Sequence, residues 1–338
     1  MDKEAVVRFS VVVPLYNKES YIRRTLESII AQTFVDYEMI VVDDGSTDDS
    51  FAVASNFLLN NTKSKIVQQK NSGVAIARNF GVSLSQGEYI CFLDSDDWWE
   101  PSFLEEMDWL IRKYPDAGLY GTAFYILKNG KKKIAPIGVN DDFSSGYINY
   151  CQTYARTLCM PISSSSVAIP RAVFNEFGGF RCGISLGEDF DLWIRIALKN
   201  QVALINKPLS NYFQDLPPHK RATRRLHNPK NHMLWNLDYL SQEEKSNREL
   251  AILLDRLRAS GLYRYYLSRQ YHDQALEIIS KIDWSHVTQK IYKKYHTPLF
   301  FQRCVYFFRC LGVKIKSLLL VSLKKTFQVD TLFSKTVF

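Results

Sequence analysis

Short apolar segments alternate with segments of helical period over the first hundred residues of the chain. The apolar segments are rich in β-branched or aromatic residues and bounded by turn residues, which is typical of β-strands. They comprise residues 9–14, 37–42, 65–69 and 89–93. Residues 20–32, 48–59 and 74–85 lie between them and carry apolar side chains at helical spacing. Ser20 is the predicted N-cap of the first helix.

This alternation predicts an α/β fold, in which right-handed crossovers build a mostly parallel sheet flanked by helices. Residues 119–127 are expected to form a further strand, and Asn129-Gly130 after it is typical of a hairpin turn. Mainly helical periodicity follows residue 216 and predicts a helical C-terminal extension. Ligands of such sheets bind beyond the carboxyl ends of the strands.

Clustered carboxylates follow two of the predicted strands. Asp43 and Asp44 end the second strand, and the segment 94–97 (DSDD) ends the fourth. Acids this close repel one another and resist burial unless a cation or hydrogen-bond donors compensate them. Both clusters fall at the carboxyl edge of the sheet, so we expect them to meet in one cleft. We expect Mg²⁺ or Mn²⁺ to offset the repulsion between these acids. The Asp-Ser-Asp segment would bind the ion, and the ion would carry a phosphorylated ligand.

Two common nucleotide-binding layouts are disfavoured. A dinucleotide-binding fold needs a glycine-rich turn after its first strand, but residues 14–20 (PLYNKES) contain no glycine. A phosphate-binding loop that ends in Gly-Lys-Ser/Thr is absent as well. The remaining interpretation is a nucleotide held by side chains and a metal ion.

Several motifs, in family order over residues 8 to 200, resemble the glycosyltransferases of family 2. These enzymes have the GT-A fold, which is Rossmann-like, and transfer sugars from nucleotide donors. The motifs are PLYNK at 14–18, SIIAQT at 28–33, VDDGSTD at 42–48, NSG at 71–73 with ARN at 77–79, GEYI at 87–90 with DSDD at 94–97, and GED at 187–189. The resemblance implies a GT-A catalytic domain over residues 1–215.

The resemblance also implies roles on the donor side. Tyr16 would pack against the nucleobase, and Asp44 would accept a hydrogen bond from a ring N–H, which suits uracil or thymine and favours a UDP-sugar. The resemblance places further donor contacts at Pro14, Asn17, Arg78, Asp94 and Ser95. Asp96 would ligate the metal, and Asp94 would hold the ribose or the donor sugar. Asp97 is expected to contact and support these ligands without binding the metal itself. Simple packing for Tyr16 and helix capping for the acids stay open as alternatives.

The reaction also needs a base for the acceptor hydroxyl. Residues 187–195 (GEDFDLWIR) are typical of a loop that enters a helix, and the helix dipole favours a carboxylate in the first turn. The resemblance points to Asp189 as this base, while Glu188 and Asp191 stay open as alternatives. A single base predicts direct displacement with inversion of the anomeric configuration.

Three further segments have weaker signals. Residues 140–166 are polar and serine-rich and are expected to line the acceptor pocket or to form an ordinary surface. By resemblance, Phe177–Phe180 (FGGF) would lie near the donor sugar. The basic stretch from Pro217 to Arg225 is either a loop that closes over the diphosphate or simply an exposed charge run.

The predicted C-terminal regions are a basic loop and helical region at 216–298 and a basic amphipathic tail at 299–338. Residues 299–325 carry arginines and lysines but no acid, with apolar side chains on the opposite helical side. We expect this tail to contact an anionic membrane surface; packing on the catalytic domain stays open. No stretch is long and apolar enough for a membrane span.

The composition of the chain narrows the choice of partners and cellular location but does not by itself indicate a function. The net charge of +8 does not indicate a nucleic-acid partner, because no recognised nucleic-acid-binding motif is present. The six cysteines lack Cys-X-X-Cys spacing and no secretory signal is visible. We therefore expect a cytoplasmic protein, peripheral on the inner face of the cell membrane.

The predicted function is a metal-dependent, inverting hexosyl- or N-acetylhexosaminyl-transferase. It would move a sugar from a nucleotide-diphosphate donor to a hydroxyl of a glycan or lipid-linked acceptor in surface polysaccharide biosynthesis. The alternative is a non-catalytic nucleotide-sugar-binding component of a glycan-assembly complex. A nucleotidyltransferase is disfavoured because no glycine-rich phosphate loop lies near the N-terminus.

Overall fold

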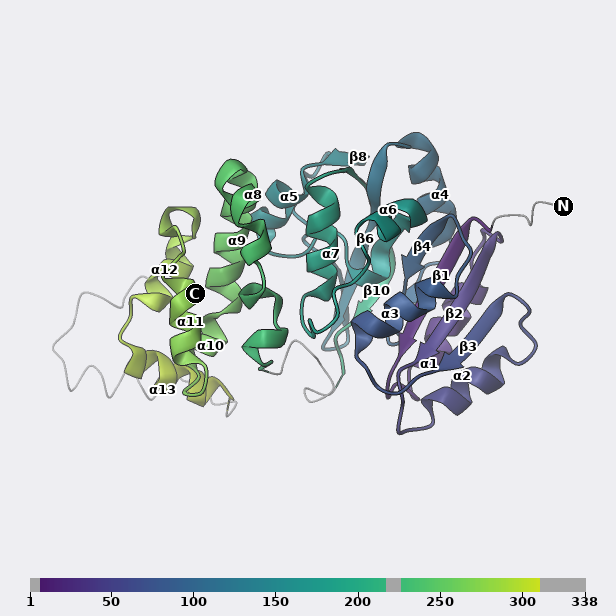
Figure 1. Cartoon of the computed structure of the whole chain (residues 1–338), viewed down its shortest axis with the longest axis horizontal. Coiled ribbons are helices and arrows are strands. Elements are labelled where there is room, and N and C mark those ends of the chain that lie inside the picture. The colour runs from purple at the N-terminus through teal and green to yellow at the C-terminus, as the bar shows by residue number, and fades with distance from the viewer. Residues whose placement is uncertain (1–6, 217–225, 311–338) are drawn as a thin grey trace. The chain divides into compact units, whose positions relative to one another are not determined.

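The computed structural model describes residues 7–216 and 226–310 (Figure 1). The chain divides into two compact units between Leu257 and Arg258. The sequence predicted boundaries between functional regions after residues 215 and 298. These boundaries differ from the division into compact units and stay predictions. The whole basic stretch at 217–225 and most of the tail, residues 311–338, lie outside the described residues.

A ten-stranded sheet forms the centre of the described part of the first unit, in the order β3-β2-β1-β4-β9-β6-β10-β5, with β7 on β6 and β8 on β10. The strands are β1 Phe9–Leu15, β2 Tyr37–Asp43, β3 Ser64–Gln68, β4 Tyr89–Phe92, β5 Trp98–Trp99, β6 Ala117–Lys128, β7 Lys131–Ile134, β8 Ser145–Ile148, β9 Val167–Pro170 and β10 Gln201–Phe213. The predicted α/β class is confirmed. The sheet is parallel from β3 to β4, and it is mixed beyond because β9 runs antiparallel to both β4 and β6.

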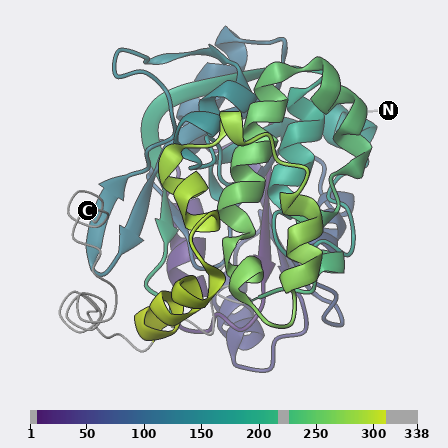
Figure 2. The ribbon, with the colours of Figure 1, turned by 90° about the vertical axis from the view of Figure 1, so that its left-hand side faces the viewer.

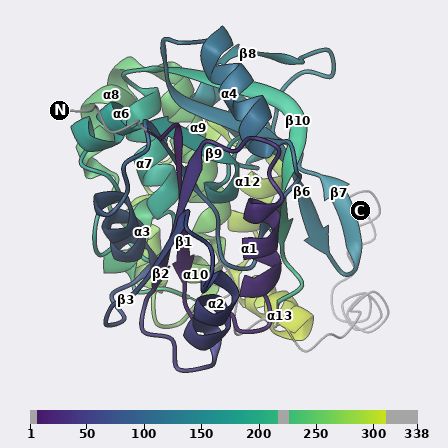
Figure 3. The same ribbon diagram turned by 90° about the vertical axis from the view of Figure 1, so that its right-hand side faces the viewer.

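Helices cover both faces of this sheet. The helices of the first unit before residue 248 are α1 Ile22–Ile30, α2 Ser50–Leu58, α3 Val74–Ser83, α4 Phe103–Lys113, α5 Tyr150–Thr157, α6 Arg171–Glu176, α7 Glu188–Ala197 and α8 Ser241–Ser246, the last of which lies away from the sheet (Figure 1). Side chains alternate along a strand, so Met39 and Val41 of β2 join the core under α1, α2 and α4, whereas Ile40 and Val42 meet Ala77 of α3. Figure 3 shows α1 and α3 on opposite sides of the first strands.

The start of α1 differs from the sequence prediction. Tyr21, not Ser20, occupies the N-cap position, and no side chain caps the helix. The backbone carbonyl of Lys18 instead accepts hydrogen bonds from the backbone N–H groups of Tyr21 and Ile22, each at 2.9 Å. The predicted serine cap was therefore wrong, because the loop after β1 closes the helix end with its own backbone.

The helical C-terminal region is confirmed. Its helices are α9 Arg248–Gly261, α10 Tyr263–Leu267, α11 His272–Ile279, α12 Gln289–Tyr295 and α13 Leu299–Cys310, shown in green to yellow in Figure 2. Within the second unit, Arg303 of α13 donates to the carbonyl of Leu267 at 3.2 Å, and Tyr295 donates to the carbonyl of Ala259 at 2.8 Å. Phe300 of α13 is 72% exposed. Among the described residues, none of the helices has the length and apolar character needed to cross a membrane.

Candidate active site

The loop after β1 is tied to the loop after β2. The N–H and hydroxyl of Thr47 donate to the side-chain oxygen of Asn17, and the N–H of Asn17 donates to Ser46 at 3.0 Å. Pro14 lies beside Val42 in the parallel pair β1–β2. Tyr16 follows this strand end with 45% of its surface exposed. An aromatic ring is thus open to a ligand next to the first acidic cluster.

Asp44 organises the turn that begins α3. Its carboxylate accepts hydrogen bonds from the N–H groups of Ser72 and Gly73 at 2.8 Å and from the side chain of Gln69 at 2.7 Å. Gly45 has a φ of 70°, and a Cβ atom there would lie 2.8 Å from the backbone nitrogen of Asn71. Only glycine therefore permits this close approach of the two loops.

The acidic loop after β4 is the densest group of charges in the site. Asp94 is one-third exposed at its side chain, whereas Asp96 is 14% exposed and Ser95 and Asp97 are buried. Burial, together with the charge of Asp94, raises the pKa of Asp96, although Lys18 opposes this shift. Burial and the neighbouring carboxylates raise the pKa of Asp97 well above its usual range. Burial leaves these carboxylates poorly solvated. A cation that binds in this loop is therefore strongly attracted to them.

Asp97 is a structural residue of this loop. Its carboxylate accepts hydrogen bonds from the N–H of Phe213 at 2.8 Å and from the hydroxyl of Ser165 at 2.6 Å. The same Ser165 hydroxyl accepts a hydrogen bond from the N–H of Asp94 at 3.1 Å. Asp97 thus fixes the acidic loop to the end of β10 and to the serine turn at Ser164–Ser166.

The serine turn connects the two halves of the site. Ser165 holds the acidic loop, and the adjacent Ser164 donates a hydrogen bond to the carboxylate of Asp189 at 2.9 Å. The sequence predicted that this stretch lines the acceptor pocket or forms an ordinary surface, not that it connects the two acidic elements. The four consecutive serines were the available signal, but their partners are 25 and 68 residues away in the chain.

Arg78 of α3 is a second connection between these halves. It is 2% exposed and forms ion pairs with Asp94 at 2.7 Å and with Glu188 at 2.9 Å. Burial lowers the pKa of Arg78, but the carboxylates of Asp94, Glu188 and Asp189 outweigh burial and raise it above its usual value. The guanidinium therefore stays charged and neutralises both acidic elements. A direct contact between Arg78 and a phosphate stays a prediction.

The three acids at the start of α7 have different surroundings. Asp191 is completely buried at its side chain, and Glu188 is 12% exposed and paired with Arg78. Burial and the nearby charge of Asp189 raise the pKa of Glu188. Asp189 is half-buried, and among the described residues its carboxylate accepts hydrogen bonds only from Ser164 and from the adjacent N–H of Phe190. Of the three acids it is therefore the most exposed and the only one without an ion pair among the described residues, and its role as a base stays a prediction.

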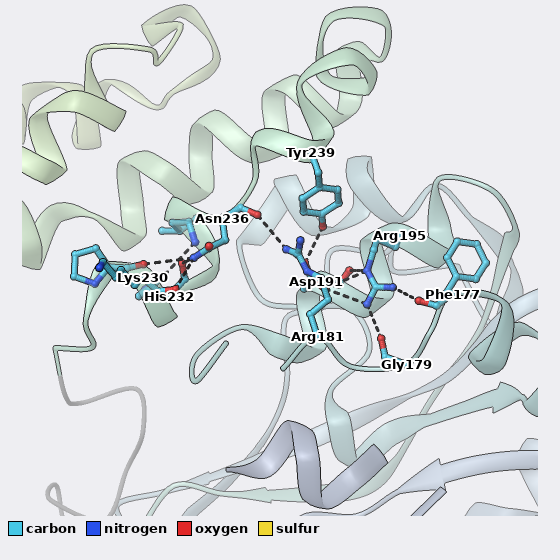
Figure 4. A network of polar contacts seen from close by, with 11 residues as sticks. Phe177, Gly179, Arg181, Asp191, Arg195, Lys230, His232, Asn236 and Tyr239 are labelled. Atoms are coloured by element: carbon cyan, nitrogen blue, oxygen red, sulfur yellow. Dashed lines mark hydrogen bonds and ion pairs between the residues drawn. The ribbon is translucent and has the colours of Figure 1, made fainter. Parts of the chain in front are cut away.

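Asp191 is the centre of a buried network (Figure 4). Arg181, Arg195 and the hydroxyl of Tyr239 all bind its carboxylate, with the tyrosine oxygen at 2.9 Å. Arg195 also donates to the carbonyls of Phe177 and Gly179. The network joins α7 to the Phe177–Phe180 loop and to the segment around residue 239. Because its carboxylate is completely buried and paired with two arginines, Asp191 is shielded from an entering hydroxyl.

Tyr212 near the end of β10 shows that these carboxylates lie in one neighbourhood. Burial raises the pKa of the Tyr212 phenol, and nearby carboxylates raise it further. These carboxylates belong to Asp97, Asp94, Asp96 and Asp189. Sequence reasoning missed Tyr212, since no pattern in the chain distinguishes it from other strand tyrosines.

The residues present fit a divalent cation that binds jointly with a diphosphate. In residues 7–216 and 226–310, no three side chains of His, Cys, Asp or Glu form a ready metal site. Mg²⁺ is often held by one or two carboxylates while substrate phosphates and water complete its shell. Asp94 and Asp96 can supply those carboxylates, and an ion would offset the burial of Asp96.

The parallel strands β3-β2-β1-β4, the acidic loop after β4 and the acidic start of α7 define the fold of a GT-A glycosyltransferase. The model of glycosyl transferase family 2 matches residues 10–176. The chain belongs to this family.

Individual relatives agree with this assignment. Glycosyltransferase GlyA of Streptococcus pneumoniae is 40% identical over 107 residues, which is 32% of this chain and 15% of GlyA. Chondroitin synthase of Escherichia coli is 33% identical over 202 residues, or 59% of this chain and 28% of the synthase. The chain thus spans less than a third of the length of these curated relatives.

Among solved structures, TarS 1-349 of S. aureus in complex with UDP-GlcNAc is similar, with a TM-score of 0.70 and 19% sequence identity. The similarity covers 90% of this chain and 92% of the TarS chain. At this level of identity the comparison shows a shared fold.

Proposed function

We propose that the chain is an inverting glycosyltransferase that transfers a sugar from a UDP-sugar to a hydroxyl of a glycan or lipid-linked acceptor. The observation that carries the proposal is the serine turn, because Ser165 holds the acidic donor loop while Ser164 holds the candidate base Asp189. Two adjacent serines thereby hold the acidic loop proposed to bind the donor and the carboxylate of Asp189 proposed to accept the proton. Names of curated relatives, such as chondroitin synthase, support a role in polysaccharide synthesis.

A uridine nucleotide fits the donor side best. Tyr16 offers an exposed ring at the end of β1, and Asp44 lies beside it at the end of β2 as an acceptor for a ring N–H. The UDP-GlcNAc bound in S. aureus TarS, which shares the fold, supports the same donor class. We propose contacts of Pro14, Asn17, Asp94 and Ser95 with the rest of the donor.

The proposed reaction is a direct displacement. Asp189 takes the proton of the acceptor hydroxyl. The oxygen of that hydroxyl forms a bond to the anomeric carbon of the donor sugar while the bond between this carbon and the diphosphate breaks. UDP leaves with the electron pair. Mg²⁺ or Mn²⁺ at Asp94 and Asp96, when bound, would supply positive charge for the leaving group. Arg78 holds Asp94 and Glu188 in place throughout.

Product stereochemistry tests this proposal. After a screen of nucleotide-sugars by thermal shift with Mn²⁺ has found the donor, NMR of the transfer product should show an anomeric configuration opposite to that of the donor. Inversion is expected because one base and one displacement are available. A retained configuration would reject the mechanism. Donor binding without hydrolysis or transfer would favour the non-catalytic alternative.

We also propose that the tail holds the enzyme at the cytoplasmic face of a membrane. Phe300 is exposed on α13, and the sequence after it carries arginines and lysines but no acid as far as residue 325. Such a combination binds anionic lipid surfaces through apolar contact and charge attraction.

The full chain is expected to sediment with anionic but not with neutral liposomes. A truncation after residue 296 should lose this binding, and Phe300→Glu should weaken it several-fold because it places a like charge at the anionic surface. Leu59→Glu, which changes another exposed apolar residue in the first unit, is the matched control. A truncated chain that still sediments with anionic liposomes would reject the membrane role.

A further inference from the structure

Lys18 places a positive charge directly on the proposed metal ligand. Its ammonium lies 2.6 Å from Oδ2 of Asp96, and the two side chains are only 17% and 14% exposed. Among the described residues, Lys18 is the only side chain that forms an ion pair with Asp96. The sequence analysis assigned no role to this lysine.

The backbone of Lys18 is held in place on both sides. Its N–H donates to the hydroxyl of Ser50 at 2.7 Å, and its carbonyl accepts from the first residues of α1. The preceding Asn17 has a φ of 52° and is bound to Ser46 and Thr47. The ammonium group can therefore change partner by side-chain rotation while its backbone stays fixed.

The charges around Lys18 penalise each ligand when it arrives alone. A divalent cation at Asp96 would meet the ammonium group at close range and lose part of its attraction to the carboxylate. A diphosphate alone would meet the carboxylates of Asp94 and Asp96. When both arrive together, the cation takes the carboxylates and the ammonium group gains phosphate oxygens as acceptors.

We propose that Lys18 makes metal binding and nucleotide binding interdependent, by occupying Asp96 in the free enzyme and binding the diphosphate once the metal has taken its place. This inference rests on the proposed function and adds a positioning residue to it. The site would then disfavour a metal without a donor and a donor without a metal. Coupling of this kind acts equally on both ligands.

Calorimetry of UDP binding with and without Mn²⁺, and of Mn²⁺ binding alone, tests the proposal on the full chain. We expect Mn²⁺ to tighten UDP binding of the unchanged chain about 50-fold, and that of Lys18→Met about fivefold or less. Lys18→Met should also bind Mn²⁺ alone several-fold more tightly, because the competing cation is gone.

Three further variants make the test specific. Lys18→Arg keeps the charge and should keep the coupling within about threefold of the unchanged chain. Lys18→Gln is a second neutral variant in case Lys18→Met does not fold, which circular dichroism will show. Lys65→Met removes an exposed lysine of β3 and should leave UDP binding, Mn²⁺ binding and the coupling between them unchanged.

The outcomes separate this inference from the proposed function. If the unchanged chain binds UDP with Mn²⁺ but the folded neutral variants keep its full coupling, the role of Lys18 is overturned and the proposed function stands. If the unchanged chain binds no UDP even with Mn²⁺, both are overturned.

Discussion

Asp189→Asn is expected to lower kcat of sugar transfer by about 10³-fold, because the amide cannot take the proton of the acceptor hydroxyl. The affinity for the donor should change little, since the hydrogen bonds of Asp189 go to Ser164 and Phe190, which are not among the proposed donor contacts. Steady-state kinetics with saturating acceptor, together with calorimetry of UDP binding, measure the two effects separately.

Two variants control for disturbance of the turn at the start of α7. Ser164→Ala keeps the carboxylate but removes its hydrogen bond, so kcat should fall by about tenfold rather than 10³-fold. Ser83→Ala removes the hydroxyl of an exposed serine at the end of α3, which donates to the carbonyl of Phe80, and should stay near full activity. Near-normal turnover of Asp189→Asn would show that another group is the base.

Asp96→Ala is expected to abolish metal-dependent donor binding and to lower kcat/KM by about 10³-fold or more, because the buried carboxylate proposed to hold the metal is lost. The fold should persist, since the freed ammonium of Lys18 can turn toward solvent. Calorimetry of UDP binding with Mn²⁺ and thermal unfolding measure these two results.

The matched control is Asp116→Ala, which removes an exposed acid after α4 and should leave donor binding and turnover unchanged. Turnover of Asp96→Ala equal to that of this control would remove the metal assignment from Asp96. A large loss of thermal stability would instead indicate a structural role for the carboxylate.

The first half of the sheet could be predicted because its signals are local. Strands β1 to β4 lie within one residue of their predicted bounds, because each is a short apolar run between turn residues. The predicted hairpin turn also occurs between β6 and β7, where Asn129 and Gly130 adopt φ values of 54° and 68°.

Features that depend on distant contacts could not be predicted in the same way. No local pattern places β9 antiparallel between β4 and β6. The pairing of Arg78 with Glu188 joins residues 110 positions apart, and Lys18 meets Asp96 across 78 positions. The acids of the site were recognisable by their clustering, whereas the groups that neutralise and orient them come from separate elements.

The network around Asp191 has a consequence for engineering. Because one carboxylate holds Arg181, Arg195 and Tyr239, the segment around residue 239 and the loop at 177–180 share a single anchor. A chimera that imports either piece from another member of the family must import complementary partners for this anchor as well. Otherwise a buried aspartate loses its counter-ions, and the grafted segment would misplace the helix that carries Asp189.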